Sequence, residues 1–245
     1  MSELDPTPEE VMTIAAAREL LDGEVVLVGV GPPNAAANLA RRLDAPRCIL
    51  IYESGAIGAR PQRLPLSIGD DDLAAAAQDL VSVPEMFNYW IGGGRIDVGF
   101  LGAAQIDRVG NINTTVIGDY NHPKVRLPGA GGAPEIAATA GRILVLLRHS
   151  PRAFVGEVDF ITSVGRELNG DRGPGSAVIT DLGVLRPAAD GELELVAIHP
   201  GVEVDQVREA TGWDLRVADA LETTGPITER ELTELRALRA SAREG

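Results

Sequence analysis

The sequence has one cysteine, three histidines and no excess of basic residues. Cys48 cannot form an internal disulfide, and we expect it to be a small buried hydrophobic residue. The histidines, His122, His149 and His199, are widely separated, so no metal-ligand spacing is present and we expect no metal site. The net charge of −14 argues against nucleic-acid binding, which requires cationic patches that replace counterions.

Long hydrophobic runs are also missing, and none approaches the length of a membrane span. The first six residues are acidic and have no apolar signal core, so we expect a cytoplasmic protein with no membrane partner. Hydrophobic residues make up 44% of the chain and charged residues 24%, which is typical of globular proteins. We expect residues 1–245 to form a single domain.

Short apolar strands alternate with helical patterns along the chain. Thr7, Pro8 and Glu10 predict a helix start with a capping box, and Thr228 and Glu231 predict a second one near the end. The predicted strands are 24–30, 48–52, 96–101, 142–147, 159–163, 178–185, 193–198 and 214–218; the predicted helices are 8–21, 35–43, 70–80, 204–210 and one after 228. This alternation predicts an α/β fold with a single open, mainly parallel sheet flanked by helices.

The strand 48–52 ends abruptly in an acid. It is apolar on both faces, as in a buried parallel sheet, and Glu53 follows at its carboxyl end, where such sheets place reactive groups. Gly55 and Gly58 permit a loop that wraps closely around a ligand. The alternative interpretation is a solvated glutamate at a strand end.

Glycine-rich turns occur at Gly29–Gly31, after Glu53 and at Gly129–Gly132. In an open parallel sheet the loops at the strands' carboxyl ends share one crevice. A carboxylate there could attack an activated acyl group, and glycine amides could stabilise the oxyanion. The dinucleotide fingerprint is incomplete because Pro32 and Pro33 follow Gly31, and no Gly-x-Ser-x-Gly motif is present.

These motifs together resemble the B (β) subunit of the family I CoA-transferases, most closely the glutaconate CoA-transferase type. The matching segments are 28–33, 52–55, 97–107 with Gly110-Asn111, 129–133 and 199–202. The resemblance implies a CoA-transferase/isomerase-like fold and a Glu53 nucleophile that forms a glutamyl-CoA thioester in ping-pong transfer. It also implies an A (α) subunit partner in a heterotetramer or larger assembly, acyl-CoA and a carboxylic acid as substrates, and no cofactor other than coenzyme A as co-substrate.

The candidate site therefore consists of Glu53 as the catalytic residue and a set that binds the oxyanion, CoA or substrate. That set is Gly29, Gly31, Ser54, Gly55, Gln105, Gly129, Gly131, Gly132 and Ala133. For Gln105 a role as a turn partner is equally open.

Four further residues receive structural expectations. Asn34 is expected to cap the following helix, and His199 to be a structural turn residue. Tyr89 and Trp90 are expected to anchor the core or a subunit interface.

Two alternative functions stay open. One is a CoA-thioester, ring-cleaving hydrolase on the same fold, although that branch lacks an acid at the position of Glu53. The other is a non-catalytic sensor domain. At Pro134-Glu135 the sequence departs from many relatives, which carry a small or polar residue followed by Asp; this difference bears on acyl specificity, and the sequence does not name the acyl group.

Overall fold

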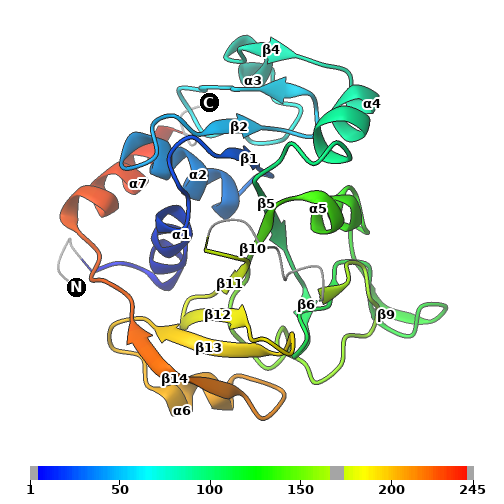
Figure 1. Ribbon diagram of the computed structural model, residues 1–245, viewed down its shortest axis with the longest axis vertical. Coiled ribbons are helices and arrows are strands. Elements are labelled where there is room, and N and C mark those ends of the chain that lie inside the picture. The colour runs from blue at the N-terminus through cyan, green and yellow to red at the C-terminus, as the bar shows by residue number, and fades with distance from the viewer. Residues whose placement is uncertain (1–4, 166–173, 242–245) are drawn as a thin grey trace. The chain divides into compact units, whose positions relative to one another are not determined.

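Strands and helices alternate along the chain in the computed structural model, which describes residues 5–165 and 174–241 (Figure 1). Contacts divide the chain into two units. Unit 1 consists of Met1–Phe100, Thr139–Gly141 and Pro226–Gly245, and unit 2 of Leu101–Ala138 and Arg142–Gly225. The predicted α/β class, with parallel strands and flanking helices, is confirmed, whereas a single domain over 1–245 stays a prediction.

Unit 1 is built around parallel strands whose residues are apolar on both faces. Its strand order is β5-β1-β2-β3-β4, in which β1 pairs in parallel with both β2 and β5, and β3 and β4 add antiparallel edges. Val26, Leu50 and Val98, one from each parallel strand, have no exposed surface. The strands are β1 (Val25–Leu27), β2 (Ile49–Ile51), β3 (Ala56–Ile57), β4 (Asp79–Leu80) and β5 (Val98–Gly102), whose last two residues belong to unit 2.

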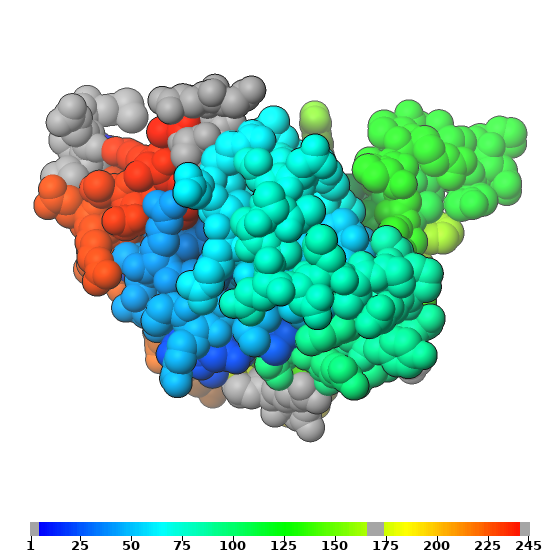
Figure 2. Space-filling view, turned by 90° about the horizontal axis from the view of Figure 1, so that it is seen from above, coloured from blue at the N-terminus to red at the C-terminus, as the bar shows by residue number. Residues whose placement is uncertain are grey.

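Three helices of unit 1 pack against one another: α1 (Pro8–Arg18), α2 (Pro32–Arg42) and α7 (Glu229–Ser241). The segment after β3 contributes α3 (Asp71–Ala75), α4 (Val83–Glu85) and the π-helix η1 (Met86–Ile91). Figure 2 shows part of this segment in cyan and blue-green on one face. Tyr89 lies in η1 and its side chain is 64% exposed, so it is not a core anchor.

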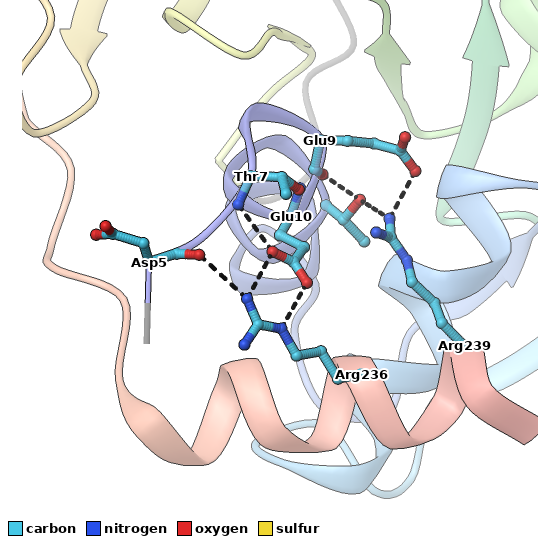
Figure 3. Close-up of polar contacts among 7 residues, drawn as sticks. Asp5, Thr7, Glu9, Glu10, Arg236 and Arg239 are labelled. Atoms are coloured by element: carbon cyan, nitrogen blue, oxygen red, sulfur yellow. Dashed lines mark hydrogen bonds and ion pairs between the residues drawn. The ribbon is translucent and has the colours of Figure 1, made fainter. Parts of the chain in front are cut away.

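Helices α1 and α7 are joined by two reciprocal ion pairs, which we call the helix clasp. Each helix begins with a capping box, Thr7–Glu10 in α1 and Thr228–Glu231 in α7, as the sequence predicts. Each capping glutamate also pairs with an arginine of the other helix: Glu10 with Arg236 at 2.8 Å, and Glu231 with Arg18 at 2.7 Å. Figure 3 shows the α1 end of the clasp, where Arg239 also reaches Glu9. The contacts therefore hold the two helices antiparallel.

The larger strands of unit 2 lie in the order β14-β13-β12-β11-β10. The pairs β10–β11 and β13–β14 are parallel, and β11–β12 and β12–β13 are antiparallel. The elements are β10 (Arg142–Leu146), β11 (Ala177–Ile179), β12 (Gly183–Pro187), β13 (Leu193–Ile198) and β14 (Arg216–Thr223), with α5 (Ala133–Thr139, its last residue in unit 1) and α6 (Val204–Glu209).

Two small hairpin sheets complete unit 2. They are β6 (Gln105–Ile106) with β7 (Ile112–Asn113), and β8 (Val116–Gly118) with β9 (Pro123–Arg126). The predicted strand at 159–163 is wrong, because Asp159 and Thr162 side chains bond to the backbone of Gly118 and Thr114 and only a single bridge at Ser163 remains. The predicted helix at 70–80 is also too long, since it ends at Ala75 and Asp79–Leu80 joins the sheet edge as β4.

Candidate active site

Glu53 and the first glycine turn leave neighbouring parallel strands at the same edge. β1 and β2 pair in register from Val25↔Ile49 to Leu27↔Ile51, and the Val28 amide donates to the Ile51 carbonyl at 2.9 Å. Gly29 and Gly31 therefore emerge beside the Glu53 turn. Within unit 1, the structure brings five predicted site residues to one edge of the sheet: Gly29, Gly31, Glu53, Ser54 and Gly55.

The turn that carries Glu53 is held by backbone contacts on both sides. The Gly55 amide donates to the Tyr52 carbonyl at 2.9 Å, and the Tyr52 amide donates to the Ala56 carbonyl at 3.0 Å. Gly55 has φ +106°, and a Cβ there would lie 1.9 Å from the Val81 carbonyl oxygen. Only glycine fits this position, so a residue that has no side chain determines where Glu53 lies.

A buried polar cluster anchors the start of the same turn. The Tyr52 hydroxyl donates to Asn34 Oδ1 at 3.0 Å, and Asn38 Nδ2 donates to the same oxygen at 2.7 Å. Tyr52 and Asn34 are almost fully buried. The expected capping role of Asn34 is wrong, because Gly31 is the N-cap of α2 and Asn34 lies inside its first turn. The spacing of four residues between Asn34 and Asn38 is the sequence signal for their shared helix face.

The Glu53 carboxylate is half-buried and unpaired. Over residues 5–165 and 174–241, no hydrogen bond or ion pair reaches it. Burial raises the pKa of this carboxyl above its ordinary value, and no neighbouring charge offsets that effect. A carboxylate with few solvating partners, on a rigid turn at the end of a parallel strand, is available for reaction with a ligand.

The first glycine turn offers open space around its glycines and few backbone N–H groups for a ligand. A Cβ at Gly29 or Gly31 would meet nothing within 4 Å, and Val30 between them is 42% exposed. Pro32 and Pro33 occupy the first two positions of α2, so this helix start has two fewer N–H groups to offer an anion. The turn is thus suited to apolar contact and close backbone approach.

The remaining predicted site residues lie in unit 2, so their closeness to Glu53 stays a prediction. Gly129 and Gly131 have positive φ values of 101° and 50°, and a Cβ at either would meet nothing within 4 Å. This open glycine loop leads through Gly132 into α5, which begins at Ala133.

Gln105 is built into a structural network of unit 2. Its Nε2 donates to Asp159 Oδ2 at 3.0 Å, while its Oε1 accepts from Asn113 Nδ2 at 2.7 Å and from the Asp159 amide at 3.1 Å. These contacts favour its role as a structural partner over direct contact with a ligand.

The histidines of unit 2 are likewise held by structural contacts. His199 bonds to Thr224 Oγ1 and to the Thr180 carbonyl, both at 2.9 Å, in agreement with its expected structural role. His149 stacks on Phe154, and burial lowers its pKa to about 4 despite nearby Asp181. Among the described residues, no group of three acidic, histidine or cysteine side chains is arranged to hold a metal, and no helix is long and apolar enough to cross a membrane.

Comparisons with known proteins identify a family and a fold. The family model described as Coenzyme A transferase matches residues 9–210. The chain is 56% identical over 241 residues to the B subunit of 3-oxoadipate CoA-transferase from Pseudomonas knackmussii, covering 94% of this chain and 92% of that protein. It is 36% identical over 235 residues to the B subunit of glutaconate CoA-transferase from Acidaminococcus fermentans, covering 90% and 88%. The crystal structure of glutaconate coenzyme A-transferase from Acidaminococcus fermentans superposes with a TM-score of 0.85 at 31% identity, covering 97% of this chain and 95% of that one, which confirms the predicted fold.

Proposed function

The chain belongs to the coenzyme A transferase family, and from this premise we propose that it is the B subunit of an acyl-CoA:carboxylate CoA-transferase in which Glu53 is the nucleophile. The observation that carries the proposal is the unpaired, half-buried Glu53 carboxylate on a backbone-locked turn. The catalytic task requires a carboxylate that is free to attack, and a structural carboxylate would be paired.

In the proposed reaction, a Glu53 oxygen attacks the thioester carbonyl of acyl-CoA. The C–S bond breaks, giving an acyl–glutamyl anhydride and CoA thiolate. The thiolate then attacks the glutamyl carbonyl, forming a glutamyl-CoA thioester and releasing the first carboxylate. A second carboxylic acid runs these steps in reverse, so Glu53 is regenerated and the sequence needs no electron transfer. The half-buried setting assists because a weakly solvated carboxylate is a stronger nucleophile.

The open glycine loop is assigned to the developing oxyanion. Each attack places negative charge on a carbonyl oxygen, and backbone amides that carry no side chains can approach such an oxygen closely. The loop's two positive-φ glycines, Gly129 and Gly131, support this assignment because open space surrounds both. Gly29, Gly31, Ser54 and Gly55 are assigned to the surroundings of the acyl group and the CoA thioester.

The relatives supply a partner and a first substrate to test. Both are named as B subunits of CoA-transferases, so we propose that this chain works with an A subunit. The relative at 56% identity is named for 3-oxoadipate, and we propose a short oxo-dicarboxylic acid as the acyl group. This choice makes 3-oxoadipate the first acceptor to assay.

An isotope-exchange assay on the complex of both subunits tests the proposal. A transferase moves labelled carboxylate into acyl-CoA without a second acceptor; a hydrolase releases free CoA, and a sensor domain does neither. We expect exchange with the wild-type complex and none above background with Glu53→Gln. Exchange that survives this substitution, or net release of CoA, would contradict the proposed mechanism.

A further inference from the structure

The β8–β9 hairpin, residues 116–126, exposes apolar side chains in unit 2. Figure 1 shows the hairpin extending outward from the other strands of that unit, and the green segment forms a lobe of its own in Figure 2. Tyr120 is 52% exposed and Val125 is 50% exposed. Tyr120 stacks on Phe160 with ring centroids 5.4 Å apart, and Ile161 beside it is 52% exposed. We call these four side chains, Tyr120, Val125, Phe160 and Ile161, the hairpin patch.

The hairpin is held near its turn by two contacts with residues 159–160, and its other strand pairing is internal. Its three register positions join only β8 and β9, and the Gly118 amide donates to Asp159 Oδ2 at 2.9 Å. Three of the four β9 residues are exposed. An isolated two-stranded ribbon is marginally stable in water and gains order when another surface covers it. The hairpin patch therefore has the properties of a surface completed by another molecule.

The charge of the hairpin identifies the kind of partner. Lys124 is the only lysine in the sequence, and it lies with Arg126 on β9, both exposed, in a chain whose net charge is −14. The Arg126 guanidinium lies 4.9 Å from the Tyr120 ring centroid, so a cationic group adjoins an aromatic ring of the hairpin patch. A two-fold contact that pairs β9 with β9 of a second copy would place Lys124 and Arg126 against the same residues, and like charges oppose that pairing. A different chain, with carboxylates around an apolar contact, fits better.

The hairpin is joined directly to the predicted oxyanion loop. β9 continues into Leu127, whose amide donates to the Thr115 carbonyl at 3.0 Å. The Gly129 amide donates to the Thr114 carbonyl at 2.9 Å, and Thr114 Oγ1 donates to the Gly129 carbonyl at 2.9 Å. Thr114 thus clamps the first glycine of the loop on both sides, two residues before β8 begins. A surface that orders the hairpin also orders the start of this loop.

We propose that the β8–β9 hairpin is a docking arm for the A subunit, whose contact surface carries carboxylates that pair with Lys124 and Arg126. This inference rests on the proposed function for the identity of the partner. It adds a consequence: docking at the hairpin holds the glycine loop in place through Thr114, so assembly prepares the site.

The single lysine makes a direct test possible. A carbodiimide joins an amine to a carboxylate only when the two are in contact, and Lys124 is the only side-chain amine of this chain. Treating the assembled complex should yield a cross-linked peptide pair of Lys124 with an Asp or Glu of the A subunit. Lys124→Arg keeps the charge and should abolish that pair while leaving assembly unchanged. A pair between two copies of this chain, or no pair from Lys124, would overturn the proposal.

A second measurement uses the apolar half of the surface. Val125→Glu should weaken association with the A subunit at least about tenfold in a titration of the two purified proteins, because it buries a charge against an apolar contact. Leu80→Glu is the matched control, since Leu80 is 57% exposed in unit 1 and should leave affinity unchanged. Equal affinities for Val125→Glu and wild type would overturn the proposal.

Kinetics separate this surface from a substrate site. Lys124→Glu should weaken association with the A subunit while leaving KM for acyl-CoA unchanged in complex assembled at a saturating concentration of that partner. A raised KM with normal assembly would overturn the proposal and assign Lys124 to the phosphates of CoA. Failure of the transferase mechanism leaves the assembly readout intact, so it is distinguishable from failure of the docking proposal.

Discussion

Within unit 1, the environment of Glu10 and Glu231 is the opposite of the environment of Glu53. Glu10 and Glu231 each accept bonds from a capping threonine and an arginine of the facing helix. The bond from Arg236 lowers the pKa of Glu10 to about 2; at Glu231 the bonds from Arg18 and Thr228 outweigh burial and also lower the pKa to about 2. Glu53 has no such partner among the described residues, and burial raises its pKa.

The difference separates stability from chemistry within one unit. A carboxylate surrounded by donors is strongly stabilised as an anion, and this stabilisation both ties helices together and removes its reactivity. A carboxylate fixed only through the backbone of its turn keeps its lone pairs for a substrate. Glutamate therefore serves two functions in this unit. Substitution of Glu53 should lower turnover and leave the fold stable, whereas substitution of Glu10 should lower stability and leave turnover near normal.

The largest effect is expected from Glu53→Gln. Losing the nucleophile should lower turnover at least about a thousandfold, or roughly 4 kcal/mol of barrier. Glu53→Asp keeps the charge but withdraws the oxygens by one methylene, which should cost about a hundredfold. Neither change should lower the free energy of unfolding measured in urea, because the Glu53 side chain contributes no bond to the described fold. Normal turnover with Glu53→Gln would remove the distinction between the two kinds of glutamate.

Gly55→Ala should damage both stability and turnover. The added Cβ meets the Val81 carbonyl at 1.9 Å in a positive-φ conformation, so we expect about 2 kcal/mol or more of destabilisation and a displaced Glu53. Gly29→Ala is the control for stability, because nothing lies within 4 Å of its Cβ position and its φ is ordinary. Urea unfolding and turnover of both variants test this, and equal stabilities would show that the turn is not locked.

Glu10→Gln should lower stability and spare turnover, which is the opposite of the effect expected for Glu53→Gln. It breaks a pair between a 5% exposed glutamate and Arg236, and we expect about 2 kcal/mol less unfolding free energy with turnover near normal. A loss of turnover in a fully folded variant would contradict the separation of roles.

The pH dependence of stability and the pH dependence of activity should also distinguish Glu10 from Glu53. The pKa of Glu10 is lowered from 4.5 to about 2 in the fold, so its stabilisation is complete above pH 4.5 and is lost as the pH falls toward 2. The stability difference between wild type and Glu10→Gln should shrink over that window. Because the pKa of Glu53 is raised, acidification should begin to lower kcat/KM while the pH is still above 4.5 and the helix clasp is intact. Loss of kcat/KM only below pH 4.5 would contradict this order.

The smallest effect is expected from Glu9→Gln, one residue before Glu10. Glu9 pairs with Arg239 at 2.7 Å, but its side chain is 56% exposed, so solvent screens the pair. We expect less than about 0.5 kcal/mol of change in urea unfolding. A loss equal to that of Glu10→Gln would show that burial does not distinguish the two pairs.

Local signals predicted much of the fold. Thr7–Glu10 and Thr228–Glu231 form the capping boxes read from spacing alone, because such boxes involve residues three apart. The predicted buried strand before Glu53 is also present as β2, although it is shorter. These features depend on residues close in sequence.

Features that join distant segments were not predicted. Glu10 and Arg236 are 226 residues apart, and no local pattern indicates that an arginine will replace water around a capping glutamate. Gly55 is readable as a turn residue, but its contact with Val81 depends on β3–β4 pairing. The strand expected at 159–163 failed for the same reason, since side chains from 159 and 162 satisfy backbone groups elsewhere.

Covalent trapping at Glu53 is the most direct measurement of the central claim. The complex is incubated with acyl-CoA and no acceptor, then treated with borohydride, which reduces a glutamyl-CoA thioester. Peptide mapping should find the mass change in the segment Ile51–Arg60 of this chain, and Glu53→Gln should abolish it. A label that maps to another segment, to the A subunit, or persists in Glu53→Gln would contradict the assignment of Glu53 as the nucleophile.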